Sequence, residues 1–338
     1  MTRYVIVGAG AVGACLAVEL ADRGHEVLLI ARGATLEQLA AQPLSYHTHA
    51  GERQVRLPVA AIGDDLGLRL GDILVLAVKT QDVAGAAAEL AWRDVVDRQG
   101  GVLGTAAELV PIVTVQNGLD AERAAARWFE TVIGAVFMIS AQYVRVGEVR
   151  VGGYPAIGAA IAGVAAGDPA TGEQTLKTVV ADLRAANFGM APVADIRAYK
   201  AAKILHSVRN GVEVLAGDRS AKQAVGDALV AEARRVLAAA GIAHHETEDL
   251  VLDPDQESFS EASGVRRHRQ STWQSFARGA GGHEADYLNG EIALLARLHG
   301  TDAPLNARLQ QLLGRAARHG GGLEQPGLDL LLERIAGS

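Results

Sequence analysis

A glycine-rich loop close to the start of the chain limits the possible folds more than any other segment. Residues 8–13 read GAGAVG, directly after the β-branched run at residues 4–7. An Ala/Leu-rich stretch follows the loop and ends at Gly24. A G-x-G-x-x-G pattern between a strand and a helix is typical of the first turn of a dinucleotide-binding βαβ unit. The loop residues expected to bind the dinucleotide are Gly8, Ala9, Gly10, Ala11, Val12 and Gly13.

The three glycines of this loop are expected for three different physical reasons. Gly8 would make the tight turn, Gly10 would let the backbone approach a pyrophosphate, and Gly13 would let the helix pack close to the strand. The start of the helix also presents unpaired N–H groups and a positive dipole end, which attract phosphate. We therefore predict a dinucleotide site here rather than a glycine-rich turn without a ligand.

The end of the second expected strand, residues 26–30, indicates which dinucleotide binds. Enzymes that use NAD place an acidic residue there, which accepts hydrogen bonds from the ribose hydroxyls. This chain has Ala31 and Arg32 instead, and an arginine can pair with the 2′-phosphate of NADP. An ordinary surface charge is the alternative explanation of Arg32. The sequence predicts NADPH as the cofactor.

Two patterns of apolar residues predict two domains. Through about residue 190, β-branched runs alternate with Ala/Leu-rich stretches, which is typical of a parallel sheet with helices on its faces. After Asp195, apolar residues recur at helical spacing. We expect an α/β chain with a Rossmann-type doubly wound parallel sheet at residues 1–194 and an all-α domain at 195–338. The expected strands are residues 4–7, 26–30, 73–78, 112–115 and 132–137, with a β-meander at 142–161; the expected helices of the second domain are 196–216, 221–241, 284–299 and 305–335.

Composition argues against several classes of protein. The net charge is −7 without a long basic stretch, which is unlike a nucleic-acid-binding protein. No uncharged apolar run reaches the ~18 residues that a membrane span requires. Cys15 is the only cysteine, so no intrachain disulfide can form, and we expect a cytoplasmic protein. The acids and histidines His244, His245, Glu246 and Glu248 fit no defined ligand set, so we expect no metal site.

Four further segments occur in the same order as motifs of one enzyme family. They are Val78-Lys79-Thr80, Gln116-Asn117-Gly118, Lys203-Ile204-Leu205 and the stretch HEADYLNG at residues 283–290. Together with the glycine loop, they make nearly the whole chain resemble the ketopantoate reductase family. The resemblance implies an NADPH-dependent oxidoreductase acting on CH–OH donors, which reduces 2-dehydropantoate to (R)-pantoate in pantothenate and coenzyme A biosynthesis. A homodimer formed through the helical domain is a further expectation.

The resemblance also implies roles for single residues. A ketone reduced by hydride needs a proton donor, and Lys203 matches the family's catalytic lysine. Glu284 matches the acidic residue that would hold the product hydroxyl and orient the lysine. Lys79 and Asn117 match cofactor-binding positions at strand ends, although each charged residue of this set could also be an ordinary surface charge. The expected substrate contacts are Asn117, Ser207, Asn210 and Ser271.

Departures from the family pattern leave the substrate open. Family members carry asparagines four and eight positions after the catalytic lysine, where this chain has Ser207 and Gly211. We interpret this as a pocket with more room, in which bulkier 2-oxo acids are accepted. Asn210 shares a helix face with Lys203 and could replace the lost contacts. The alternatives are a reductase of another 2-oxo acid or of an imine, including opine-type substrates, and a non-catalytic NADP(H)-sensing protein.

Overall fold

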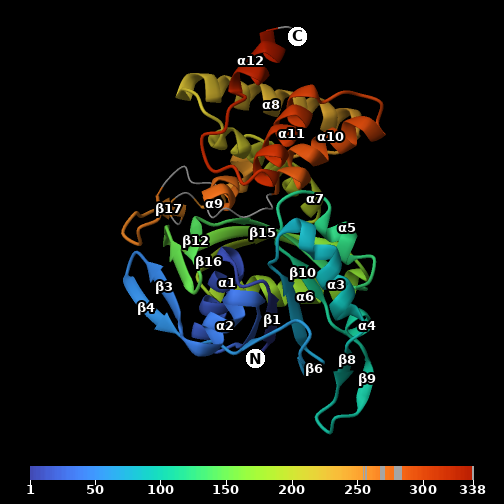
Figure 1. Cartoon of the computed structure of the whole chain (residues 1–338). Helices are drawn as coiled ribbons and strands as arrows, with labels where there is room; N and C mark the ends of the chain where they lie inside the picture. Colours follow the sequence, from blue (N-terminus) through green and yellow to red (C-terminus); the bar gives the residue numbers. More distant parts are fainter. Residues whose placement is uncertain (254, 256, 267–270, 278–283, 337–338) are drawn as a thin grey trace. The chain divides into compact units, whose positions relative to one another are not determined.

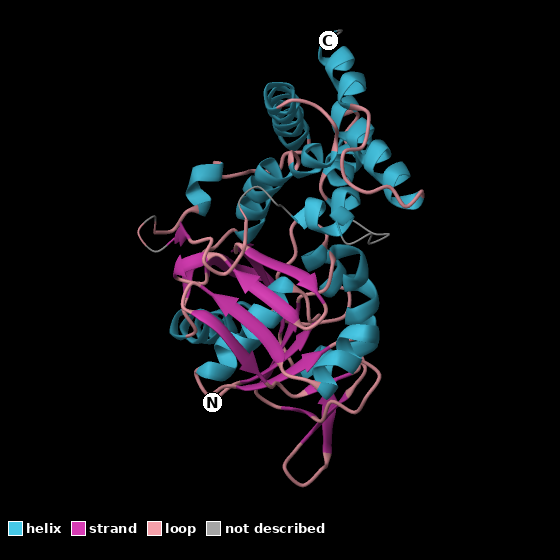
Figure 2. Ribbon diagram, turned by 60° about the vertical axis from the view of Figure 1, so that its left-hand side comes forward, coloured by secondary structure: helices cyan, strands magenta, loops and turns pink. Residues whose placement is uncertain are grey.

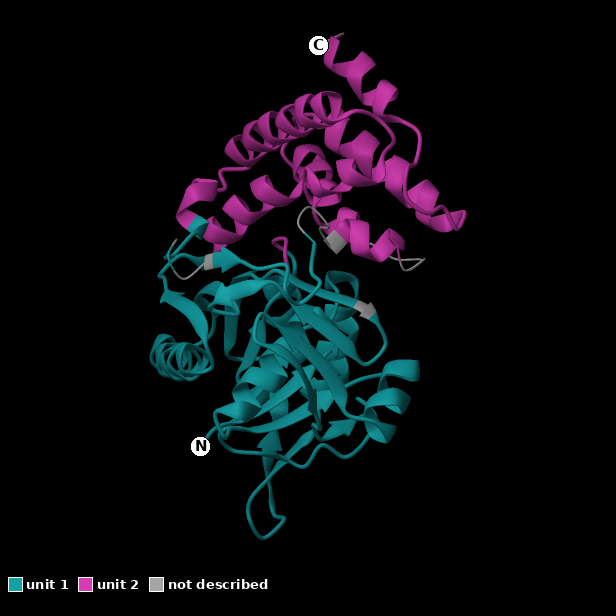
Figure 3. Cartoon of the chain, turned by 90° about the vertical axis from the view of Figure 1, so that its left-hand side faces the viewer, with its two compact units in different colours: residues 1–116, 120–196, 250–267 teal, residues 117–119, 197–249, 268–338 magenta. Residues whose placement is uncertain are grey.

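Contacts within the chain divide it into two compact units, shown in two colours in Figure 3. The structure, a computed structural model, describes residues 1–253, 255, 257–266, 271–277 and 284–336. Unit 1 consists of residues 1–116, 120–196 and 250–267, and unit 2 of residues 117–119, 197–249 and 268–338. Each unit buries its own apolar clusters.

Unit 1 is built around an eight-stranded sheet with the strand order β16-β15-β11-β10-β7-β1-β2-β5. Figure 1 labels several of its strands, and Figure 2 draws strands in magenta. Every neighbouring pair is parallel except β11 and β15. This confirms the expected sheet. The strands are β1 (Arg3–Val7), β2 (Glu26–Ile30), β5 (Val59–Ala60), β7 (Asp72–Leu76), β10 (Ile112–Thr114), β11 (Val132–Met138), β15 (Gly158–Ala166) and β16 (Phe188–Pro192).

Helices pack on both faces of this sheet, because successive side chains of a strand point to opposite faces. Tyr4 and Ile6 of β1 join the core formed with α1 and α6, whereas Val5 and Val7 join the core formed with α3 and α5. A strand buried on both faces needs a continuous apolar run, which is what β1 has. The helices of unit 1, with 3₁₀ helices labelled η, are α1 (Ala11–Asp22), α2 (Gly33–Ala41), η1 (Thr80–Asp82), α3 (Val83–Ala91), α4 (Ala106–Leu109), α5 (Ala121–Ala125) and α6 (Pro169–Ala185).

The meander expected at residues 142–161 is divided among three sheets, one of which contains its short strand β14 (Gly153–Pro155). Its last strand, β15, joins the main sheet, whereas β12 (Ala141–Arg145) and β13 (Glu148–Val151) belong to a four-stranded sheet of order β12-β13-β3-β4. The other two strands are β3 (Leu44–Thr48) and β4 (Gly51–Val55). The apolar pattern did not predict β4, because its sequence GERQV is polar and largely exposed. A separate three-stranded sheet contains β6 (Leu68–Arg69), β8 (Asp94–Val96) and β9 (Val102–Thr105).

The regular elements described in unit 2 are helices, as expected for the second domain. The long helix α8 packs against α10, α11 and α12, and their apolar faces form one core. The helix expected at 196–216 ends at Ser207, and the one expected at 305–335 is two helices. None of the described helices is long and apolar enough to cross a bilayer. The helices are α7 (Ile196–Ser207), η2 (Asn210–Val214), α8 (Arg219–Ala239), η3 (Thr247–Leu250), α9 (Ser271–Ala277), η4 (Glu284–Tyr287), α10 (Asn289–Leu298), α11 (Pro304–Arg318) and α12 (Leu328–Ala336).

One strand from the part of the chain that was expected to be all-helical belongs to unit 1. β17 (Glu257–Phe259) pairs antiparallel with β14 (Gly153–Pro155). Residues 250–267 therefore lie in unit 1, whereas the sequence placed them in a helical domain that starts at residue 195. A three-residue strand is too short to show a period-two pattern. The loop expected at residues 279–282 lies outside the described residues.

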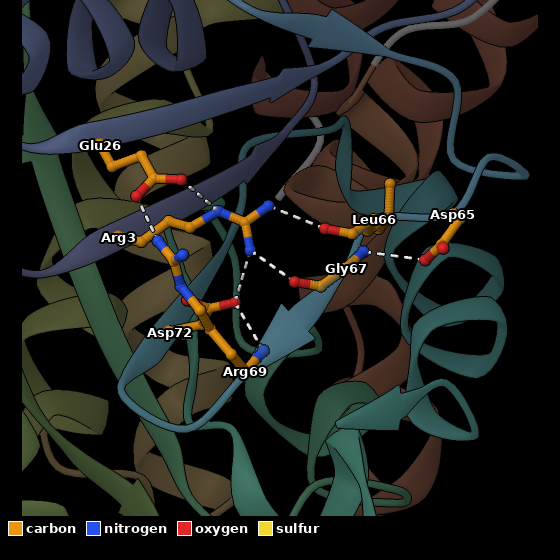
Figure 4. Close-up of polar contacts among 7 residues, drawn as sticks. All are labelled: Arg3, Glu26, Asp65, Leu66, Gly67, Arg69 and Asp72. Carbon is orange, nitrogen blue, oxygen red and sulfur yellow. Dashed lines mark hydrogen bonds and ion pairs between the residues drawn. The ribbon is translucent and has the colours of Figure 1, made fainter. Parts of the chain in front are cut away.

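A partly buried ion-pair cluster closes the amino-terminal edge of the sheet in unit 1 (Figure 4). Arg3 and Asp72 are the first residues of the neighbouring strands β1 and β7, and Arg3 Nη1 donates to Asp72 Oδ2 at 2.9 Å. Arg3 also donates to the carbonyl oxygens of Leu66 at 2.7 Å and Gly67 at 2.9 Å. Burial raises the pKa of the Asp72 carboxyl, against the opposing effects of the Arg69 amide and of Arg3. The ion pair thus joins the first residues of β1 and β7, although burial of the Asp72 charge is unfavourable.

Replacing Asp72 by alanine would leave the Arg3 guanidinium without its buried carboxylate. Removing one partner of a buried ion pair costs several kcal/mol, and Arg3 would keep its two carbonyl acceptors. We therefore expect the free energy of unfolding, measured in urea, to fall by about 2–3 kcal/mol. Glu26→Ala is the control, because Glu26 pairs with Arg3 at 3.3 Å but is 58% exposed; it should lose less than about 1 kcal/mol. Equal losses would contradict a special role of the buried carboxylate.

Candidate functional site

The loop between β1 and α1 in unit 1 has no room for a side chain at two of its glycines. Gly8 has a φ of +115°, and a Cβ there would lie 2.7 Å from the backbone of Ala77. A Cβ at Gly13 would lie 1.9 Å from the carbonyl oxygen of Gly8. The Gly8 N–H donates to Ile30 O at 2.9 Å, which ties the turn to β2. α1 can therefore start directly over the carboxyl end of β1.

Gly10 differs from the other two glycines because space is open beside it. A Cβ at Gly10 would meet no described atom within 4 Å. Gly10 is also the N-cap of α1 and makes no side-chain capping bond, so the first N–H groups of the helix lack that acceptor. A phosphate needs such donors and such space. This part of the loop fits the pyrophosphate of a dinucleotide.

Lys79 follows the carboxyl end of β7, the strand beside β1. It is the N-cap of η1 and ends the short segment that joins β7 to this helix. The buried side chain of Gln116 holds this segment in place: its Nε2 donates to Leu76 O at 2.7 Å and to Val78 O at 2.9 Å. Gln116 thus links the ends of β10 and β7. The sequence showed Gln116 beside Asn117 but gave no reason to expect this bracing role.

Arg32 lies two residues after β2, as expected, and it has an acidic neighbour that the sequence did not indicate. Its Nη2 lies 2.9 Å from Oδ2 of Asp82. The β2 end itself carries no acidic residue, but the fold brings one from 50 residues further along the chain. A carboxylate therefore stands beside Arg32 in the fold, although the sequence next to Arg32 contains none.

Lys203 lies on α7 of unit 2 among apolar residues. Its neighbours Ala202, Ile204 and Leu205 are fully buried, and Lys203 itself is partly buried. Desolvation lowers the pKa of its ammonium group from 10.5 to about 8, because burial disfavours the charged form. A lysine with such a pKa can release and regain a proton near neutral pH. Desolvation and the nearby charges of Lys203 and Arg209 lower the pKa of His206 to about 4.

The last residue of α7 and the segment that follows it include two buried polar side chains and a glycine with a packing role. Ser207 and Asn210 are both buried, and Oδ1 of Asn210 has no hydrogen-bond partner among the described residues. A Cβ at Gly211 would lie 2.5 Å from Cδ1 of Leu313 and 3.4 Å from Cδ2 of Leu309. The space of the missing side chain is thus filled by α11. Gly211 adds no room for a substrate, contrary to the expectation.

Two segments expected to contribute to the site lie against other parts of unit 2. Gly118 has a φ of +95°, and a Cβ there would lie 2.7 Å from the carbonyl oxygen of Tyr287. The turn at Asn117 and Gly118 therefore packs against η4, which begins with Glu284. The helix α9, which begins at Ser271, packs against η2. The side chain of Ser271 lies outside the described part of the structure, as does residue 283.

A chain of buried hydrogen bonds fixes the end of α7. Asn289 Nδ2 donates to Val208 O at 2.8 Å and to Asn306 Oδ1 at 2.9 Å. Asn306 Nδ2 donates to Oε1 of Glu232 at 3.0 Å, and Glu232 also accepts the N–H groups of Leu305 and Asn306 at the start of α11. The sequence gave Glu232 no role. A carboxylate on the apolar face of the helix expected at residues 221–241 is the sequence signal that could have identified Glu232.

The acids and histidines at residues 244–248 have structural partners. His244 Nδ1 lies 3.1 Å from the carbonyl oxygen of His245, and the His245 ring stacks on Tyr199. Glu246 pairs with Arg234. Within the described ranges, no group of three or more His, Cys, Asp or Glu side chains could hold a metal ion.

Comparison with protein families gives two matches that together span most of the chain. Residues 4–160 match ketopantoate reductase PanE/ApbA. Residues 198–317 match the C-terminal domain of ketopantoate reductase PanE/ApbA. The chain belongs to the ketopantoate reductase PanE/ApbA family. A search of curated proteins found no match.

Solved structures share the fold of this ketopantoate reductase family member over almost its whole length. A PanE/ApbA family ketopantoate reductase from Ralstonia eutropha JMP134 is 22% identical, with 94% of this chain and 99% of that chain covered and a TM-score of 0.71. D-mandelate dehydrogenase, solved with NADH and anilino(oxo)acetate, is 18% identical, with 94% and 98% covered and a TM-score of 0.74. A dimeric ketopantoate reductase from Staphylococcus aureus is 19% identical, with 95% and 100% covered and a TM-score of 0.62.

Two glycines of this ketopantoate reductase family member provide a matched pair of variants. Gly10→Ala should leave the free energy of unfolding within about 1 kcal/mol, because its Cβ meets open space. It should nevertheless weaken binding of a reduced nicotinamide dinucleotide tenfold or more, on the order of 1.4 kcal/mol, because the methyl group would occupy the space that fits a pyrophosphate. Gly13→Ala should instead lower stability by about 1–3 kcal/mol. Urea unfolding and NADPH fluorescence titration measure the two effects. Normal NADPH binding by Gly10→Ala would show that the open space is not the phosphate site.

Proposed function

We propose that this protein reduces the keto group of a 2-oxo acid with NADPH, and that Lys203 is the general acid. The observation that carries the proposal is Lys203 itself, a partly buried lysine with a pKa of about 8. Such a pKa suits a group that must be protonated before the reaction and lose its proton during it. The glycine loop supports the cofactor assignment, because it combines open space with the uncapped start of α1.

Reduction of a ketone requires a hydride at the carbonyl carbon and a proton at its oxygen. Bound NADPH would supply the hydride. Lys203 would donate its Nζ proton to the oxygen as negative charge develops there, so that the C=O group becomes CH–OH and the ammonium becomes a neutral amine. Burial favours this transfer, because the neutral amine is the form that desolvation stabilises. Solvent would then return a proton to Lys203.

The remaining residues would bind and orient the reactants. Lys79 and Asn117 would contact the cofactor from the ends of β7 and β10, and Arg32 would contact the 2′-phosphate. Glu284 would accept a hydrogen bond from the product hydroxyl and orient Lys203. The packing of Gly118 against Tyr287 supports a shared location of Asn117 and η4. A lysine and a carboxylate are not needed for cofactor binding alone, which favours catalysis over a sensing role.

The best-supported substrate is 2-dehydropantoate, which would give (R)-pantoate for pantothenate and coenzyme A biosynthesis. Ser207, Asn210 and Ser271 are the proposed substrate contacts. The buried Oδ1 of Asn210 supports its assignment, because an unsatisfied buried acceptor costs roughly 1–3 kcal/mol, which a ligand donor would remove. A bulkier 2-oxo acid is the second candidate. It is favoured by the short side chain at Ser207 and by the anilino(oxo)acetate complex of D-mandelate dehydrogenase.

Removing the Lys203 amine should slow the reaction without preventing cofactor binding. We expect Lys203→Ala to lower turnover by about 10²–10⁴-fold and to keep its NADPH affinity. Since the acid must be protonated, kcat/KM of the unaltered protein should be level at low pH and fall as pH rises through about 8. The pH profile of Lys203→Ala should not show this fall in kcat/KM.

The control for this prediction is Lys177→Ala, since Lys177 is an exposed lysine on α6. It should keep both the rate and the pH profile. Near-normal turnover of Lys203→Ala on an active substrate would remove Lys203 from the proton transfer, and Lys79 would be examined next.

The choice between the two substrate candidates depends on Ser207. Because asparagine carries both a donor and an acceptor, Ser207→Asn should raise the ratio of kcat/KM for 2-dehydropantoate over an aromatic 2-oxo acid by about tenfold, on the order of one hydrogen bond. NADPH absorbance measures both rates. High efficiency of the unaltered protein on 2-dehydropantoate, with no activity on bulkier acids, would contradict the second candidate.

Imine reduction of opine type and NADP(H) sensing are the rival functions. A panel of 2-oxo acids with and without an amine separates them, because a sensor consumes no NADPH and an imine reductase requires the amine. We also propose a cytoplasmic location and a homodimer formed through the helical domain. Burial raises the pKa of the Cys15 thiol, which fits an unreactive cysteine in a reducing compartment.

A further inference from the structure

Arg32 and Asp82 form an ion pair that joins two different strand ends in unit 1. Arg32 follows β2 and Asp82 ends η1, which follows β7. β2 and β7 flank β1, the strand that leads into the glycine loop. The nearest approach is 2.9 Å, between Arg32 Nη2 and Asp82 Oδ2. The pair therefore stands at the edge of the sheet where the dinucleotide is proposed to bind.

The Asp82 side chain is not used for local structure. Asp82 directly precedes α3 with a helical backbone, at a φ of −94° and a ψ of −9°, and it makes no side-chain capping bond to that helix. Its carboxylate contacts Arg32 instead.

The pair is loose enough for a ligand to compete with it. The Arg32 side chain is 83% exposed and that of Asp82 is 32% exposed. Exposed ion pairs of this kind contribute little to stability. A 2′-phosphate, with a charge of about −1.5 to −2 at pH 7, could take Arg32 but would then lie close to the Asp82 carboxylate. A free 2′-hydroxyl would meet an acceptor there, as in NAD-dependent enzymes.

We propose that Asp82 is a specificity-determining residue that lowers the preference of this protein for NADPH over NADH. Its carboxylate competes with the 2′-phosphate for Arg32 and repels that phosphate, and it accepts a hydrogen bond from the 2′-hydroxyl of NADH. The two cofactors are thereby brought closer in affinity than Arg32 alone would make them. This assignment rests on the proposed dinucleotide binding.

Binding of NADPH and of NADH to the protein without substrate tests the assignment. Fluorescence titration of each nucleotide gives two dissociation constants and their ratio. In Asp82→Asn, NADPH should bind about five- to tenfold more tightly, as expected for removing one charge near a phosphate, and NADH should bind no better than before. The gain for NADPH should shrink at high salt, which screens exposed charges. Arg32→Gln should instead weaken NADPH binding tenfold or more and leave NADH binding nearly unchanged.

The matched control is Asp120→Asn. Asp120 pairs with Arg123 at 3.6 Å, and its side chain is 32% exposed, the same as that of Asp82. It should leave the ratio within twofold of the unaltered protein. If both nucleotides bind and Asp82→Asn leaves the ratio within twofold, or if Asp120→Asn shifts it equally, the assignment fails and the proposed function stands. If neither nucleotide binds the unaltered protein, both fail.

Discussion

The carbonyl oxygen of Gly8 lies where a side chain at residue 13 would begin, 1.9 Å from the position of its Cβ. Because Gly13 has no side chain, α1 starts directly over the end of β1, and its first N–H groups reach the edge of the sheet. The neighbouring strands end at the same edge and bring Arg32 and Lys79 there. The proposed cofactor site depends on this close packing, since a helix held further out would carry its phosphate donors away.

Among the described residues of unit 2, the buried polar side chains are almost all paired. A chain of hydrogen bonds links the start of α11 to the carbonyl oxygen of Val208, at the end of α7. It runs through the side chains of Glu232, Asn306 and Asn289. This network fixes the helix that carries Lys203. Asn210, two residues further on, keeps a buried oxygen without a partner among the described residues. This unpaired acceptor supports the proposed role of Asn210 in substrate binding, because an unpaired buried polar group is costly unless a ligand satisfies it.

Local patterns predicted the parts of the fold that depend on neighbours in the sequence. The glycine loop, β1 and β2 were expected, because tight turns and buried strands leave a signal within a few residues. Contacts between segments that lie far apart in the sequence were not expected. Nothing near Arg32 indicated Asp82, and three residues of β17 could not reveal that they pair with β14. Gly211 was expected to leave room for a substrate, but side chains of α11 occupy that space. Only the tertiary packing shows this.

The fate of the hydride tests the central claim most directly. The protein would be given NADPH with deuterium at both hydrogen positions of the nicotinamide C4, so that either face delivers the label, and a panel of 2-oxo acids that includes 2-dehydropantoate and phenylglyoxylate. Mass spectrometry and NMR would locate the label. The account predicts a 2-hydroxy acid with one deuterium at C2, in an amount equal to the NADPH consumed. A protein that binds NADPH but gives no labelled hydroxy acid from any member of the panel would contradict it.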